Sequence, residues 1–131
     1  MRLCVDTNVL VRAVMADDAA QAGIAAKVLT DAALIAVSLP CLCEFVWVLK
    51  RLYRVESSDV AAAIRALLAA SNVQTNRLAV EAGLAVLDAG GDFADGVIAY
   101  EGRWLGGETF VSFDKQATNL LSAQGHKAQL L

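Results

Sequence analysis

Hydrophobic residues recur along the chain in two patterns: short apolar runs, and longer segments with one apolar face. The short runs begin with Leu3-Cys4-Val5 and are typical of buried strands. The longer segments have helical spacing, as between Pro40 and Tyr53. This alternation predicts an α/β fold with a parallel sheet. The expected strands are 2–6, 34–37, 109–112 and 127–131, and the expected helices are 19–32, 40–53, 57–70, 76–89, 93–104 and 114–122.

Local signals mark where several of these helices begin and end. Asp18 and Gln21 have the spacing of a capping box, which predicts a helix start. Pro40 suits the first turn of a helix, because its missing N–H is not needed there. Gly90-Gly91 is expected to end a helix. No linker, repeat or low-complexity segment interrupts the pattern, so we expect a single domain over residues 1–131.

Composition is typical of a folded protein with much covered apolar surface. Of the 131 residues, 57% are hydrophobic, and the mean hydropathy is +0.52. These values exclude disorder and are compatible with a partner protein that covers part of the surface. The formal charge is −3, which is opposite in sign to that of a plain basic nucleic-acid binder. Acids clustered in a cleft with basic residues around it remain compatible with this sign.

Cysteine usage and the absence of export signals predict a cytoplasmic protein without a membrane segment. Cys4, Cys41 and Cys43 are odd in number and lie in apolar segments, as is typical of reduced core thiols. Asp6 interrupts the first apolar run, so a signal peptide is not indicated. The most apolar stretch, 32–49, contains proline and glutamate and fits a strand, a break and a helix better than a membrane span.

Asp6 is the first candidate for chemistry, because it ends a predicted buried strand. A buried ionised carboxylate is costly unless it is paired or bound to a metal. Ligands of open α/β sheets bind outside the carboxyl ends of the strands. We therefore interpret Asp6 as a metal ligand, with Thr7 and Asn8 as supporting residues. The alternative is an N-cap for a following helix.

Two further candidates interrupt apolar helical segments. Glu44 is interpreted as a site residue, and the alternatives are a surface position or pairing with Lys50 or Arg51. Asp92 and Asp95 are three residues apart and share one face of a first helical turn. An N-cap role explains Asp92, which we also regard as a support for the site. Asp95 is followed by apolar residues, and we interpret it as a ligand.

Asp114 repeats the situation of Asp6, because it follows the predicted strand 109–112. The alternative is again an N-cap, here of the last helix. The hydroxyl of Ser112 is expected either to orient a carboxylate or water, or to satisfy backbone groups. His126 is interpreted as a surface loop residue and not as a catalytic base.

The combination of Asp6, Glu44, Asp95 and Asp114 indicates more than any one of them. Four carboxylates cannot share a dry pocket without neutralisation. A hard divalent cation with oxygen ligands, Mg²⁺ or Mn²⁺, provides it. Such sites suit phosphodiester hydrolysis. Neither G-x-G-x-x-G nor G-x-x-x-x-G-K-[ST] is present, so dinucleotide or Walker-type phosphate binding is not supported.

The segments that carry these acids resemble the PIN domain family, and more narrowly the VapC-type toxin ribonucleases of bacterial toxin–antitoxin pairs. They are VDTNVL at 5–10, Glu44 in its helix, FADGVIA at 93–99, and VSFDK at 111–115. The resemblance covers essentially the whole chain. Two departures are Ser112, where the family often has Thr, and Gly96, where Ala is common and whose glycine should loosen the helix start slightly.

The resemblance implies a three-layer fold with a short parallel sheet flanked by helices on both faces. It implies an Mg²⁺-dependent endoribonuclease that acts as a toxin, with Asp6 and Asp95 as the main metal ligands. Glu44 and Asp114 would complete the site directly or through water. The implied partners are the RNA substrate, a cognate antitoxin that covers the site, and a second copy of the chain in a homodimer.

Two rival functions are weighed against this one. The first is a catalytically silent PIN-like module that acts through a protein partner. The second is a receiver-type phosphoryl-transfer switch, which expects an acidic pair after the first strand that Asp6-Thr7-Asn8 does not supply. Trp47 and Trp104 are core candidates that also suit a partner surface. The candidates for RNA contacts, with solvated surface charge as the alternative for each, are Arg12, Lys50, Arg51, Arg54, Arg103 and Lys115.

Overall fold

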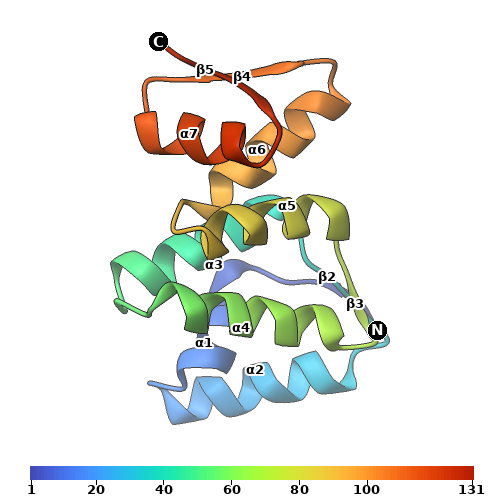
Figure 1. The fold of residues 1–131 in the computed structure, drawn as a ribbon. Coiled ribbons are helices and arrows are strands. Elements are labelled where there is room, and N and C mark those ends of the chain that lie inside the picture. The colour runs from blue at the N-terminus through green and yellow to red at the C-terminus, as the bar shows by residue number, and fades with distance from the viewer. The chain divides into compact units, whose positions relative to one another are not determined.

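The computed structural model describes residues 1–131 and confirms the α/β class with short parallel sheets (Figure 1). Two compact units make up the chain, Met1–Asn76 and Arg77–Leu131. The single domain expected from the sequence stays a prediction. No helix has the length and apolar character needed to cross a bilayer.

The amino-terminal unit contains a three-stranded parallel sheet in the order β1-β2-β3. Leu3 pairs with Ile35, and Ile35 pairs with Val73, so β2 is the central strand. Helices connect the parallel strands, as such connections require. The elements are β1 (Arg2–Cys4), α1 (Thr7–Met15), α2 (Ala19–Asp31), β2 (Leu34–Ala36), α3 (Leu39–Arg51), α4 (Ser57–Ala69) and β3 (Val73–Gln74).

The core of this unit is built on the central strand and on α3 and α4. Ile35 is fully buried, as are Leu42 on α3 and Ile64 on α4. Asn72 ties the approach to β3 to the end of α2, because its Nδ2 donates to the carbonyl oxygens of Leu29 at 2.8 Å and Ala32 at 3.0 Å. These two bonds hold the edge of the sheet against the preceding connection.

Two elements of this unit were not predicted, α1 and the two-residue β3. Valines make α1 a weak helix former by propensity, but the helix buries Leu10 and Val11 and packs against α2 and α3. The prediction of core cysteines is wrong for Cys4, which is exposed, and the core assignment is wrong for Trp47, which is 54% exposed.

The carboxy-terminal unit contains the parallel pair β4 and β5, connected through α7. Thr109 pairs with Lys127 and Ser112 with Leu130. The core prediction is also wrong for Trp104, which is 76% exposed. The elements are α5 (Arg77–Asp88), α6 (Phe93–Trp104), β4 (Thr109–Ser112), α7 (Lys115–Ala123) and β5 (Lys127–Leu130).

Helices α5 and α6 approach each other closely at two glycines. A Cβ atom added to Gly96 would lie 2.3 Å from the carbonyl oxygen of Ala82, and one added to Gly83 would lie 2.6 Å from the Phe93 ring. Gly96 therefore permits a backbone approach that alanine would obstruct, which corrects the expectation of a merely looser helix. Gly90 follows α5 with φ of +94°, where glycine is favoured and the helix ends.

Candidate functional site

Asp6 is the N-cap of α1, so the alternative weighed for it is realised. Its Oδ1 accepts the backbone N–H of Thr7 at 2.8 Å. The side chain is exposed, which overturns the burial argument that first singled it out. A capping bond engages one carboxylate oxygen, so Oδ2 is still available to a ligand.

Asp6 and Glu44 line one cleft of about 260 Å³ within the amino-terminal unit. Glu44 is exposed on α3. It makes no ion pair with Lys50, whose Nζ donates to Ser57 Oγ. Successive turns of α1 and α3 form the walls, because the lining positions are spaced by about one helical turn. The full lining is Asp6, Thr7, Asn8, Val11, Arg12, Glu44, Val48, Leu52 and Tyr53.

Thr7 contacts Asp6 through its backbone N–H and is itself buried. Its hydroxyl shares a hydrogen bond with the thiol of Cys41 in α3. Burial raises the pKa of the Cys41 thiol, and the Thr7 hydrogen bond opposes that rise. The thiol is therefore a neutral packing group behind the start of α1. Asn8, by contrast, is exposed at the cleft.

The carboxy-terminal unit brings Asp95 near Asp92 and Asp114. Asp92 is the N-cap of α6, and its Oδ1 accepts the N–H of Ala94 at 3.2 Å. Asp95 lies half-buried in the first turn of the same helix. Burial raises the pKa of the Asp95 carboxyl to about 6, and the charges of Asp92 and Asp114 add to the rise. A cation beside Asp95 would relieve this repulsion.

Asp114 is held at the start of α7 by two hydrogen bonds. Its Oδ1 accepts the N–H of Ala117 at 3.1 Å, so the N-cap alternative is realised here too. Ser112 Oγ accepts the N–H of Asp114 at 2.9 Å. The Ser112 hydroxyl thus satisfies a backbone group, and in doing so it fixes the turn that presents the carboxylate.

The donor set fits a hard divalent cation. All the acids concerned offer carboxylate oxygens, the ligands that Mg²⁺ and Mn²⁺ prefer. Asp6 and Glu44 line one cleft in the amino-terminal unit, and in the other unit Asp92 and Asp114 are near enough to Asp95 to raise its pKa. The structure contains no group of three or more His, Cys, Asp or Glu side chains that could by itself hold a metal ion.

Sequence reasoning missed the hydrogen-bond network around Arg12 in the Asp6 cleft. Arg12 contacts Asp17, Gln21 and Tyr53. The sequence did suggest Arg12 as an RNA contact, but not what holds it. The spacing of Asn8 and Arg12, four residues apart, would have placed both on one helix face had α1 been predicted.

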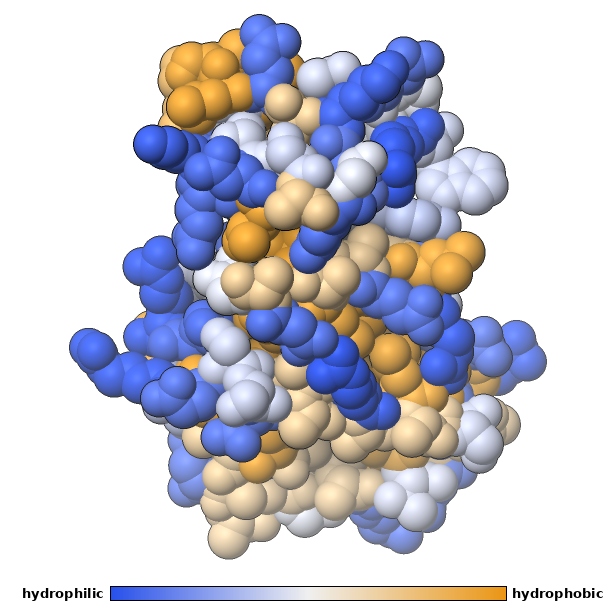
Figure 2. Space-filling model, in the orientation of Figure 1, coloured by the Kyte–Doolittle hydropathy of each residue, from blue (hydrophilic) through white to orange (hydrophobic).

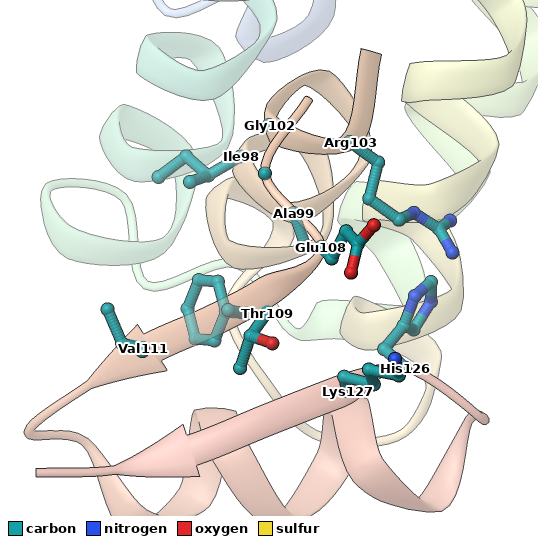
Figure 3. Close-up of a pocket in the computed structure, with 11 residues that line it drawn as sticks. Ile98, Ala99, Gly102, Arg103, Glu108, Thr109, Val111, His126 and Lys127 are labelled. Carbon is teal, nitrogen blue, oxygen red and sulfur yellow. The ribbon is translucent and has the colours of Figure 1, made fainter. Parts of the chain in front are cut away.

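A second cavity, of about 220 Å³, lies in the carboxy-terminal unit at the amino ends of β4 and β5 (Figure 3). Arg103, Glu108 and His126 point toward one another there. Its position is opposite to the end of β4 that Asp114 follows. His126 is half-buried and its Nδ1 has no hydrogen-bond partner, so the surface-loop interpretation is incomplete. Burial and the charge of Arg103 lower the pKa of His126. Glu108 is the one acid that lines this cavity, beside Arg103 and Lys127, so the cavity contains no cluster of acids.

Comparison with protein families agrees with the resemblance seen in the sequence. The family model of the PIN domain matches residues 3–120, which includes all four acids and spans most of the chain. A search of curated proteins finds no match. PIN domains are generally nucleases, and they typically use divalent metals. The chain therefore belongs to the PIN domain family and has a fold of nuclease type.

Proposed function

We propose that this protein is an Mg²⁺-dependent endoribonuclease that hydrolyses RNA phosphodiester bonds. The observation that carries the proposal is the pairing of acids in a PIN domain: Asp6 lies with Glu44 in one cleft, and Asp95 lies near Asp114. We further propose that all four carboxylates serve one reaction. A non-catalytic binding role would not require carboxylates at all four of these positions.

In this proposal Asp6 and Asp95 are the main ligands of Mg²⁺, and Mn²⁺ suits the same oxygens. Glu44 and Asp114 act directly or through water. When bound, the metal supplies positive charge that offsets the carboxylates and polarises the phosphodiester. The capping bonds hold one oxygen each of Asp6 and Asp114 and so fix the direction of the other.

The neighbouring groups would keep these carboxylates in place. Ser112 fixes the backbone of Asp114, and Thr7 supplies the N–H that holds Asp6. Asp92 begins the helix that carries Asp95, and its charge disfavours a second negative charge there until a cation binds. Asn8 offers an exposed amide at the mouth of the cleft.

The test is RNA cleavage by amide variants. Asp6→Asn removes the charge but keeps the cap, because Asn caps helices as well as Asp does. We expect cleavage to fall by about a hundredfold or more while the melting temperature is unchanged. EDTA should abolish wild-type cleavage, and Mg²⁺ or Mn²⁺ should restore it.

Three outcomes would contradict the proposal, each in a different way. A pure Asp6→Asn preparation that cleaves like the wild type would refute the nuclease site. Loss of cleavage in Glu44→Gln but not in Asp95→Asn or Asp114→Asn would refute the joint use of the four acids. A wild type that cleaves no RNA with either metal would favour the silent binding module instead.

We also propose that the enzyme is the toxin of a cytoplasmic toxin–antitoxin pair, on the strength of the segments that resemble such toxins. Expression in a bacterium should then arrest growth, and Asp6→Asn should not. Co-expression of a small protein encoded beside it should restore growth. Growth that is equal with wild type and Asp6→Asn would refute the toxin role while leaving the chemistry open to direct assay.

A homodimer is the remaining part of the proposal, supported by apolar side chains on the surface. Figure 2 shows a broad apolar surface in the region where α2 and α4 lie in Figure 1. Ile24 on α2 is 65% exposed, and its neighbours one turn away on the same helix include Ala20 and Val28. Light scattering after size exclusion should give twice the monomer mass of 13.8 kDa. A monomer at micromolar concentration would refute this part.

A further inference from the structure

Arg12 is the one cation among the residues that line the Asp6 cleft. It lies on α1 one turn beyond Asn8, on the face that meets Glu44 across the cleft. Lys50, Arg51 and Arg54, which the sequence also suggested as RNA contacts, do not line this cleft. A phosphate that approaches Asp6 and Glu44 therefore meets one positive side chain of this unit.

The guanidinium of Arg12 is held by groups from three different segments. Its Nε donates to Gln21 Oε1 at 2.7 Å on α2, and its Nη1 donates to Asp17 Oδ1 at 3.1 Å in the preceding turn. Nη1 also reaches the Tyr53 hydroxyl oxygen at 3.5 Å, just after α3. Tyr53 in turn donates to Asp17 Oδ2 at 2.8 Å. These contacts close a ring that fixes the plane of the guanidinium.

This ring leaves part of the arginine unused. Arginine has five N–H donors in a planar fork. The contacts to Gln21, Asp17 and Tyr53 use Nε and Nη1, and none of them uses Nη2. A guanidinium that is already fixed loses little conformational freedom when it binds a second partner. Its free edge is thus suited to an oxygen of a phosphate, the partner that arginine recognises best.

We propose that Arg12 binds a backbone phosphate of the RNA in the Asp6 cleft, and that Asp17 and Tyr53 are the positioning residues that aim it. The inference rests on the proposed ribonuclease function. It supplies one cationic donor in a cleft that also holds two carboxylates, and the metal of the proposed function would supply the remaining positive charge. It also gives a purpose to the Tyr53–Asp17 hydrogen bond, which the helices do not need for their own backbone groups.

The test compares Arg12→Gln with Arg2→Gln, an identical change at an exposed arginine of the same unit outside the cleft. Loss of a charge-assisted hydrogen bond should lower kcat/KM for single-stranded RNA by about ten- to a hundredfold, mainly through KM. The slope of log kcat/KM against log salt concentration is negative, and the loss of one phosphate contact should make it shallower by about 0.7. Arg2→Gln should leave kcat/KM within about twofold of the wild type.

Tyr53→Phe tests the positioning part, because it removes only the hydroxyl. The charge stays, so the salt slope should match that of the wild type while kcat/KM falls about threefold to tenfold. A purely structural ring would instead lower the melting temperature of Arg12→Gln and leave kcat/KM unchanged well below melting. That result, with a wild type that cleaves RNA, would overturn the inference and leave the ribonuclease function standing. An inactive wild type would overturn both.

Discussion

Replacement of Asp95 by asparagine is expected to stabilise the metal-free protein and to disable it. The carboxyl of Asp95 has a pKa of about 6 in the folded protein, against 3.8 for the free group. A difference of about 2 pKa units corresponds to about 3 kcal/mol. Asp95 is half-exposed, and solvent screening reduces this to about 1.5 kcal/mol. Asparagine keeps the shape without the charge and should recover that amount at pH 7.5.

The pH dependence gives the sign of the effect. Between pH 3.8 and about 6 the folded protein keeps a proton on Asp95 that the unfolded chain has released. The free energy of unfolding therefore falls as the pH rises through this window, and the full cost is present above pH 6. The advantage of Asp95→Asn should be largest at pH 7.5, smaller at pH 5 and absent near pH 3.8.

Urea denaturation in EDTA, followed by circular dichroism at these pH values, measures the difference. Glu81→Gln is the control for loss of one negative charge, because Glu81 is exposed on α5 of the same unit. Saturating Mg²⁺ should stabilise the wild type and not Asp95→Asn. Equal stabilities at pH 7.5, or an advantage that grows as the pH falls, would refute the reasoning.

Three other predictions concern the packing of α5 and α6, the edge of the three-stranded sheet, and Asp17. In urea denaturation, Gly96→Ala should lower the free energy of unfolding by about 1–3 kcal/mol, because the added Cβ meets the α5 backbone. Gly102→Ala on the same helix has open space and should raise it by about 0.5–1 kcal/mol. A stabilised Gly96→Ala would contradict the close approach of the two helices. Asn72→Ala should cost about 1–3 kcal/mol, measured the same way, because two carbonyl oxygens lose their donor, and an unchanged midpoint would show that water replaces it. The hydrogen bond from Tyr53 lowers the pKa of Asp17. The stabilisation that ionised Asp17 gives the folded protein is therefore present above pH 3.8 and is lost as the pH falls through the lower pKa of the folded state. Thermal melts over this acid range should show a smaller loss of stability for Asp17→Asn than for the wild type.

The sequence predicts best those elements whose pattern agrees with local propensity. The helix over 93–104 and the strand over 109–112 are found with the predicted limits. Helix α1 was missed because Val9, Val11 and Val14 favour extended backbone and the strand ends only two residues before the helix. Packing against α2 and α3 makes this segment helical, and that packing cannot be predicted from the helix propensity of the segment alone.

The candidate site shows the same division. Asp92, Asp95 and Asp114 could be read from the sequence because each stands at or near the start of a helix, where local rules apply. The ring around Arg12 could not be predicted from the sequence, since Tyr53 and Asp17 are 36 residues apart. They come together only because α3 packs against α1 in the folded chain. The burial argument for Asp6 failed because a short strand and an exposed helix start leave it in water.

Asp6 and Asp114 cap helices, and in the proposed function they also act at the metal site, which has a consequence for how these positions would evolve. Each begins a helix through one oxygen, so a lineage that gave up the chemistry would still be selected for a cap at both positions. Its descendants should drift there to Asn, Ser or Thr and should avoid Ala, whereas Glu44, which caps nothing, should drift freely. The kind of residue at these three positions would then report, from sequence alone, whether a relative has kept its reaction or only its shape.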